Sequence, residues 1–207
     1  NGGIWLWQGL VDGCVVTNCN AQNSSGTRMA GGGIRMEGGT VRNSTIAKCE
    51  RTRYTGGGIW MGSSSCLVEN CRIVGCKENY DASSKGGGIY ASNGRIRNCL
   101  ITGCSCYGTG LGVYLAGSTV MENCTVANCT NTKNNSGAGI AAAGYAEVRN
   151  CISWNCTNLA GEKDIELSGG ASAEFCNSIP QQDALSNNIS VDPQFGGGYD
   201  LSGFTDC

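Results

Sequence analysis

The 207-residue chain contains no histidine and only two prolines, and charged residues make up just 14% of it. Without histidine, Ser-His-Asp and Cys-His catalysis, histidine-ligated zinc and imidazole acid–base chemistry are all excluded. The scarcity of proline excludes collagen-like and proline-rich disordered chains. A formal net charge of −2 argues against a nucleic-acid partner. No apolar run approaches the roughly 18 residues of a membrane span.

Glycine and cysteine, by contrast, are abundant, with 34 and 15 residues. Gly-Gly-Ile or a weaker variant of it occurs at 2–4, 32–34, 57–59, 87–89, 111–113, 138–140 and 163–165. Most occurrences are followed by an apolar residue, a charged residue, Asn and Cys, as in Val68–Glu69–Asn70–Cys71, with a second Cys five residues later. A repeat of about 24 to 30 residues is typical of stacked solenoid units.

Within each unit, apolar residues alternate with outward-facing ones, as in Ile59–Trp60–Met61 and Ile89–Tyr90–Ala91. This period of two indicates short strands, and the Gly, Asn and Ser between them are turn formers. A single unit cannot bury itself, but it can when stacked on its neighbours at about 4.8 Å per coil. The sequence therefore predicts an all-β parallel solenoid of about seven coils.

These repeats resemble the right-handed parallel β-helix of the pectate-lyase-like superfamily, in particular the Gly-Gly-Gly-Ile repeats of bacterial cell-surface and polymorphic-outer-membrane-type proteins. The resemblance covers nearly the whole chain and implies a right-handed, single-stranded parallel β-helix. It implies β-helix coils over 1–179 and, over 180–207, a C-terminal closing segment of the same domain. It also implies an extracellular or cell-surface location. Because the chain starts inside the repeat at Asn1, we expect further repeats upstream.

Aligning the units places matched residues in columns along the stack. The asparagine column contains Asn43, Asn70, Asn98, Asn123 and Asn150, and we expect its side-chain amides to hydrogen-bond from coil to coil. The charged column alternates in sign and contains Asp12, Arg42, Glu69, Arg97, Glu122, Arg149 and Glu174. Opposite charges on neighbouring strands favour one register. The alternative, paired carboxylates for glycoside chemistry, is weaker because neighbouring arginines hold each acid ionised.

Two columns also contain most of the cysteines. They are Cys14, Cys71, Cys99, Cys124, Cys151 and Cys176, and then Cys19, Cys49, Cys76, Cys104, Cys129 and Cys156. A disulfide-rich secreted scaffold is one interpretation. However, stacked side chains keep Cβ atoms near 4.8 Å apart, wider than the roughly 3.8 Å that a disulfide prefers. We therefore expect reduced thiols that pack as small apolar groups, and no bound metal, because the usual C-x2-C spacing is missing.

An outward column of aromatic residues is the first candidate for a binding surface. It contains Trp5, Arg35, Trp60, Tyr90 and Tyr114, and the polar connections beside it add Arg51, Arg53, Tyr54, Glu78, Tyr80, Asp81 and Lys85. Aromatic faces suit sugar rings, and an adjacent arginine can hold a carboxylate. The alternative is purely structural: the aromatic side chains cap strands or lie under loops, and the polar connections are only solvated.

Two classes of function fit this surface. The first is a non-catalytic extracellular solenoid that serves as a surface stalk, adhesin or glycan-binding module, with no cofactor. The second, implied by the superfamily resemblance, is a lyase or hydrolase acting on acidic polysaccharide, with Arg51 or Lys85 as base near Glu78 and Asp81, and with Ca²⁺ as a cofactor of a lyase. Expected partners are a carbohydrate or cell-surface ligand, or another solenoid stacked end to end on an exposed strand edge.

Overall fold

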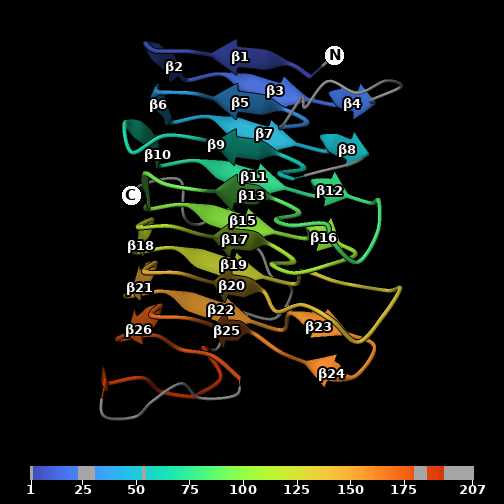
Figure 1. The fold of residues 1–207 in the computed structure, drawn as a ribbon, viewed down its shortest axis with the longest axis vertical. Helices are drawn as coiled ribbons and strands as arrows, with labels where there is room; N and C mark the ends of the chain where they lie inside the picture. The colour runs from blue at the N-terminus through green and yellow to red at the C-terminus, as the bar shows by residue number, and fades with distance from the viewer. Residues whose placement is uncertain (1, 23–30, 53–54, 180–185, 194–207) are drawn as a thin grey trace.

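A computed structural model describes residues 2–22, 31–52, 55–179 and 186–193, and these wind into a parallel β-solenoid. Figure 1 shows the coils stacked along the long axis, with the N-terminal coil at the top and β26 towards the bottom. The predicted all-β parallel solenoid is confirmed. Its first two sheets contain seven strands each and the third contains six, so seven coils begin and about six turns are completed.

Each coil contributes one short strand to each of up to four sheets, which we call sheets A to D. Sheet A contains β1 (Ile4–Leu6), β5 (Ile34–Met36), β9 (Ile59–Met61), β13 (Ile89–Ala91), β17 (Val113–Leu115), β20 (Ile140–Ala142) and β25 (Ile165–Leu167). Sheet B contains β2 (Leu10–Asp12), β6 (Gly39–Arg42), β10 (Cys66–Glu69), β14 (Arg95–Arg97), β18 (Val120–Glu122), β21 (Glu147–Arg149) and β26 (Ser172–Glu174).

The other two sheets are shorter. Sheet C contains β3 (Val15–Thr17), β7 (Thr45–Ala47), β11 (Arg72–Val74), β15 (Leu100–Thr102), β19 (Thr125–Ala127) and β22 (Ile152–Trp154). Sheet D contains β4 (Asn20–Gln22), β8 (Glu50–Thr52), β12 (Lys77–Glu78) and β16 (Ser105–Cys106). In place of a further parallel strand in sheet D, β23 (Thr157–Asn158) and β24 (Gly161–Glu162) form an antiparallel pair.

The core is made by identical positions stacked in register. In sheet A, for example, Ile34 pairs with Ile59, and Ile59 with Ile89, and all three side chains are fully buried. The glycines before these isoleucines are required by close backbone approach. A Cβ at Gly57 would lie 2.2 Å from the Gly87 carbonyl oxygen and 2.4 Å from that of Lys77. Any side chain there would separate the coils.

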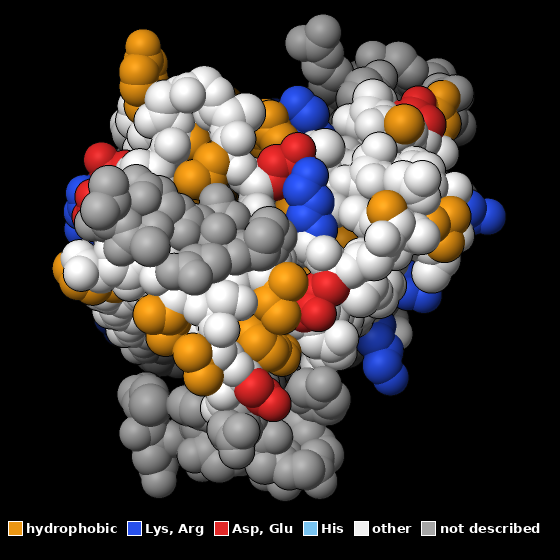
Figure 2. All heavy atoms as spheres, turned by 90° about the horizontal axis from the view of Figure 1, so that it is seen from below, with side chains coloured by type: hydrophobic (Ala, Val, Ile, Leu, Met, Phe, Trp, Pro, Cys, Tyr) orange, Lys and Arg blue, Asp and Glu red, His pale blue; other side chains and the backbone are white. Residues whose placement is uncertain are grey.

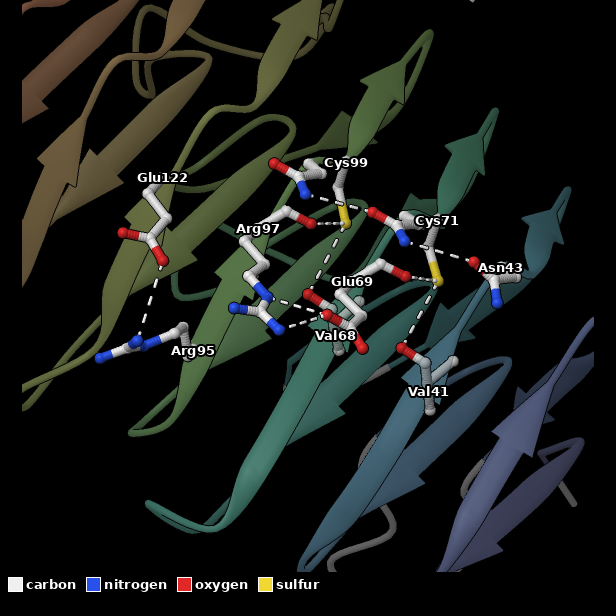
Figure 3. A network of polar contacts seen from close by, with 11 residues as sticks. Val41, Asn43, Val68, Glu69, Cys71, Arg95, Arg97, Cys99 and Glu122 are labelled. Carbon is white, nitrogen blue, oxygen red and sulfur yellow. Dashed lines mark hydrogen bonds and ion pairs between the residues drawn. The ribbon is translucent and has the colours of Figure 1, made fainter. Parts of the chain in front are cut away.

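The asparagine column occupies a left-handed turn between sheets B and C. Its five members have φ values of 50 to 53°, a conformation that asparagine tolerates better than most residues. The predicted amide ladder is present over three coils: Asn70 Nδ2 donates to Asn43 Oδ1 at 3.3 Å, and Asn98 Nδ2 to Asn70 Oδ1 at 3.2 Å. Figure 3 shows these contacts. The conformation and the ladder together explain why asparagine recurs there.

The described cysteines are all free thiols, as expected, and most are buried. Their sulfurs also donate hydrogen bonds between coils, which the sequence did not predict. Cys71 Sγ donates to the Val41 carbonyl of the preceding coil at 3.6 Å, and Cys99 Sγ to the Val68 carbonyl at 3.7 Å. Many of the column thiols, such as Cys71 and Cys99, therefore act both as small apolar groups and as weak donors between coils (Figure 3).

The charged column has the predicted register, with Asp12, Arg42, Glu69, Arg97, Glu122, Arg149 and Glu174 paired in sequence along sheet B. Close ion pairs form between Arg42 and Asp12 at 2.8 Å and between Arg97 and Glu69 at 2.7 Å. Arg149 instead pairs at 2.6 Å with Glu147 of its own strand, since both side chains point outward. The column therefore favours the register but forms close ion pairs only in part.

The segment 186–193 lies against the C-terminal end of the stack. Asn188 accepts a hydrogen bond from the Cys176 backbone N–H at 2.8 Å and donates one to the Ala173 carbonyl at 2.8 Å. The rest of the expected closing segment, residues 180–185 and 194–207, lies outside the described residues. Figure 2 shows this end, where acidic and basic side chains are interspersed among apolar ones. Among the described residues, no helix has the length and apolar character needed to cross a membrane.

We predict that, among the described cysteines, only the partly exposed Cys14 and Cys19 of the first coil react quickly with a thiol reagent in the native protein. Cys207 lies outside the described residues and is not part of this prediction. The other described thiols are buried, so the reagent cannot reach them, and burial also raises the pKa of the Cys106 and Cys176 thiols to about 12, which disfavours their reactive thiolates. Titration with Ellman's reagent, with and without guanidinium, measures this. Fast reaction of most thiols in the folded state, or few thiols after unfolding, would contradict it.

Candidate functional site

The outward side of sheet A presents the predicted column of Trp5, Arg35, Trp60, Tyr90 and Tyr114. We call this column, together with the adjoining Trp7, Glu37 and Lys85, the aromatic face. The strand register places Trp5 beside Arg35, Arg35 beside Trp60, Trp60 beside Tyr90 and Tyr90 beside Tyr114. The five residues predicted for this column therefore lie together. They come from five successive coils, so the face runs along the solenoid axis.

The rings of this face stack on one another. The Trp60 and Tyr90 ring centroids lie 6.5 Å apart with planes 7° from parallel, and those of Tyr90 and Tyr114 lie 5.5 Å apart at 2°. Two cations extend the stack. The Arg35 guanidinium lies 5.1 Å from the ring centroids of both Trp5 and Trp60, and Lys85 Nζ lies 4.5 Å from that of Tyr114. Each such ring–ring or cation–ring contact contributes about 0.5–1 kcal/mol to stability at an exposed site.

The stacking of these rings limits which surfaces of the aromatic face a ligand can contact. The flat surfaces of the central rings are occupied by their neighbours, so a sugar ring cannot stack on Tyr90 in the way that the sequence suggested. Lys85 Nζ also donates to the Tyr114 hydroxyl at 3.2 Å, which fixes the end of the row.

Trp7 belongs to the face, although the sequence analysis missed it. Its ring centroid lies 5.7 Å from that of Trp5. The exposed fractions of Trp7 and Trp5 are 66% and 58%, whereas Trp60, Tyr90 and Tyr114 are only partly exposed. The signal was available, because Trp7 lies two residues after Trp5 and strand alternation turns both side chains to the same side. These two indoles are the most accessible aromatic surface of the face.

Arg35 was expected to be available for a ligand carboxylate, but it already forms an ion pair with Glu37, two residues along its own edge of the sheet. A ligand acid would have to displace Glu37. Beside this pair, Gly62 gives the Trp60 indole room: a Cβ on Gly62 would lie 2.2 Å from Trp60 Cη2 and 3.1 Å from a Glu37 carboxylate oxygen. The pair and the indole therefore fix one another's positions.

Two predicted surface residues are not on the surface. Arg51 and Glu78 are fully buried, because they occupy the inward positions of strands β8 and β12 of sheet D. The sequence analysis treated both stretches as loops, and it missed the alternation of outward Glu50 and Lys77 with these inward residues. Arg51 Nη1 donates to the Ala21 carbonyl at 3.2 Å, one coil away.

Burial raises the pKa of the Glu78 carboxyl from 4.5 to about 7, and nearby Asp81 acts in the same direction, while the Ser84 hydroxyl, the Tyr80 backbone N–H and Arg51 oppose both. Neither carboxyl oxygen has a hydrogen-bond partner. Because burial disfavours the charged form more than its neighbours favour it, the neutral form predominates below neutral pH. The group has no access to solvent and therefore none to a bound polysaccharide.

The remaining predicted site residues differ in where the structure places them. Tyr80 is exposed, and the Asp81 carboxylate accepts hydrogen bonds from the backbone N–H and the hydroxyl of Ser83, at 2.8 and 2.5 Å. Arg53 and Tyr54 lie outside the described residues. The proposed catalytic grouping of Arg51 or Lys85 with Glu78 and Asp81 is not assembled: Arg51 and Glu78 are buried, and Lys85 is on the aromatic face.

Within the described ranges, no group of three or more Cys, Asp or Glu residues is arranged to hold a metal ion. The columns of cysteine bring sulfurs together, but each thiol donates to backbone carbonyls. The aromatic face itself is built from aromatic side chains and ion pairs.

Coils of short strands that pair in parallel with the next coil define the class of parallel β-solenoids. Comparison with known families matches residues 2–153 to the right-handed beta helix region, and the chain belongs to that family. No curated protein and no solved structure matches the chain. Family membership agrees with the handedness expected from the sequence.

We predict that Gly62→Ala displaces the Trp60 indole, because the added methyl group would occupy the space of Cη2. The expected result is a red shift of tryptophan emission and a weaker near-ultraviolet circular dichroism signal, with the far-ultraviolet spectrum unchanged. Ser64→Ala, at an exposed position two residues further on, is the matched control. Unchanged tryptophan spectra in Gly62→Ala would contradict the packing described here.

Proposed function

We propose that the chain is a non-catalytic β-solenoid that binds carbohydrate at its aromatic face, in the extracellular space or on a cell surface. The observation that carries this proposal is the aromatic face itself, in which Trp5, Arg35, Trp60, Tyr90 and Tyr114 line the outward side of five successive coils. Large exposed aromatic patches are unusual on soluble proteins unless they bind something. Indole rings provide both an apolar surface for the C–H face of a sugar and an N–H donor.

The stack beneath these indoles supports the same interpretation. Arg35, held between Trp5 and Trp60 and paired with Glu37, keeps the surface rigid. A rigid surface loses little conformational entropy when a ligand binds. Further along the axis, the hydroxyls of Tyr90 and Tyr114 continue the row with groups that hydrogen-bond to sugar hydroxyls. The face would therefore suit an extended glycan that lies along the solenoid.

The polysaccharide lyase or hydrolase alternative has less support. Its suggested base and acids do not converge on one exposed position, since Glu78 and Arg51 are inside the coil. Retaining and inverting glycosidases need two carboxyl groups about 5 to 9.5 Å apart across the sugar. On the aromatic face, the carboxylate of Glu37 is committed to Arg35. A binding role requires none of this chemistry.

A glycan array followed by calorimetry tests the proposal. We expect at least one polysaccharide to bind, and Trp7→Ala to weaken its binding about two- to tenfold, because an aromatic ring contact contributes about 0.5–1.5 kcal/mol. Tyr145→Ala is the matched control, since Tyr145 is 76% exposed but lies outside the aromatic face. Both variants should unfold at the wild-type temperature. Absence of any glycan binding, or an equal loss in Tyr145→Ala, would contradict the proposal.

A further inference from the structure

The inner side of sheet D differs from the inner sides of the other sheets. Sheets A to C turn mostly apolar residues inward, but sheet D stacks Ala21, Arg51, Glu78 and Cys106 in register. The last three are fully buried. This column places a titratable carboxyl inside the wall of the solenoid, where neither the core nor the aromatic face accounts for it.

Glu78 faces a charged or titratable group from each neighbouring element. Arg51 lies on β8 in one adjacent coil, Cys106 on β16 in the other, and Asp81 in the turn that follows Glu78. Burial, the largest effect, and Asp81 disfavour an ionised Glu78, whereas the nearby Ser84 hydroxyl, the Tyr80 backbone N–H and, more weakly, Arg51 favour it. Neither Glu78 oxygen accepts a hydrogen bond. An ionised carboxylate there would lack the hydrogen bonds that make buried charges tolerable.

The turn beside Glu78, residues 79–84, is the element best able to open. Tyr80, Asp81 and Ser83 are exposed, and the turn is closed largely on itself: the Ser84 N–H donates to the Asp81 carbonyl at 3.1 Å, and the Asp81 N–H to Ser84 Oγ at 3.1 Å. Two backbone bonds tie its ends to neighbouring coils, from Asn79 N–H to the Arg51 carbonyl at 3.2 Å and from Thr109 N–H to the Ser84 carbonyl at 3.0 Å. Opening therefore leaves sheets A to C intact.

We propose that Glu78 is a proton-controlled latch for the turn 79–84: the neutral carboxyl stays buried under a closed turn, and the ionised carboxylate opens the turn to reach water. Lys85 follows the turn directly and contacts Tyr114. Opening the turn therefore also loosens the end of the aromatic face. The latch does not depend on carbohydrate binding.

The size of the effect follows from proton linkage. The pKa of Glu78 is about 7 in the closed turn and 4.5 when exposed, so the closed form binds the proton more tightly. The stability that the proton gives the closed turn is fully present below about pH 4.5 and is lost as the pH rises through 7. Between about pH 5.5 and 8.5, the ratio of open to closed turn should rise about thirtyfold.

Hydrogen exchange with mass spectrometry at these two pH values tests the latch. After correction for the intrinsic pH dependence of exchange, amides of residues 79–86 in the wild-type protein should exchange about thirtyfold faster at the higher pH. Strand β15 in the core should not change. In Glu78→Gln the turn should be equally protected at both pH values. Glu50→Gln, which removes a carboxylate from the outward side of the same sheet, is the control and should behave like the wild type.

Equal protection of the wild-type turn at both pH values would overturn the latch. So would the same pH dependence in Glu78→Gln as in the wild type, or a loss of protection that includes β15 and therefore reports global unfolding. If Glu78→Gln does not fold, measurements on the wild-type protein alone still test the latch. A carbon-13 titration of the Glu78 carboxyl should give a pKa near 7, and a pKa near 4.5 would overturn the proposal.

Discussion

The stacking of each coil on the next through parallel backbone hydrogen bonds is the constraint on which everything else depends. A coil of short strands buries too little surface to fold alone, so its stability comes from its two neighbours. Because side chains alternate across a strand, a slip of one residue would turn every core residue outward. The register must therefore be specified at many positions. It is specified by the glycines at the close backbone crossings, by the left-handed asparagine turns and by the alternating charges of sheet B.

Stacking also decides what a repeated side chain can do. Adjacent coils lie about 4.8 Å apart, so each side chain contacts the side chain at the same position of the next coil. A column therefore needs residues that can pack against, or hydrogen-bond with, their own kind. Asparagine can donate and accept along its column, whereas a thiol packs closely and donates to a carbonyl of the preceding coil. Aromatic rings stack face to face, with Arg35 between Trp5 and Trp60. Burial raises the pKa values of the Cys106 and Cys176 thiols to about 12, which disfavours the reactive thiolate at these two positions.

The sequence alone predicted the solenoid and the residues of its columns, because the columns are visible as a repeat. It predicted less well where the repeat is short or irregular. Sheet D was missed because β12 and β16 contain two residues each, too few to show a period. Arg51 and Glu78 were therefore taken for surface residues. The stacking of Trp60 on Tyr90 was missed for another reason, since a column gives the order of side chains but not the tilt of their rings.

Left-handed turns held by stacked asparagines fix the register of the coils, and Asn98 offers the most direct test of this role. Its φ is 52° and its amide donates to Asn70. Denaturant unfolding should show Asn98→Ala to be less stable than Asn98→Gly by about 1 kcal/mol, because both lose the amide but only glycine accepts the conformation freely. Equal stabilities of the two variants, or a more stable alanine variant, would contradict the account.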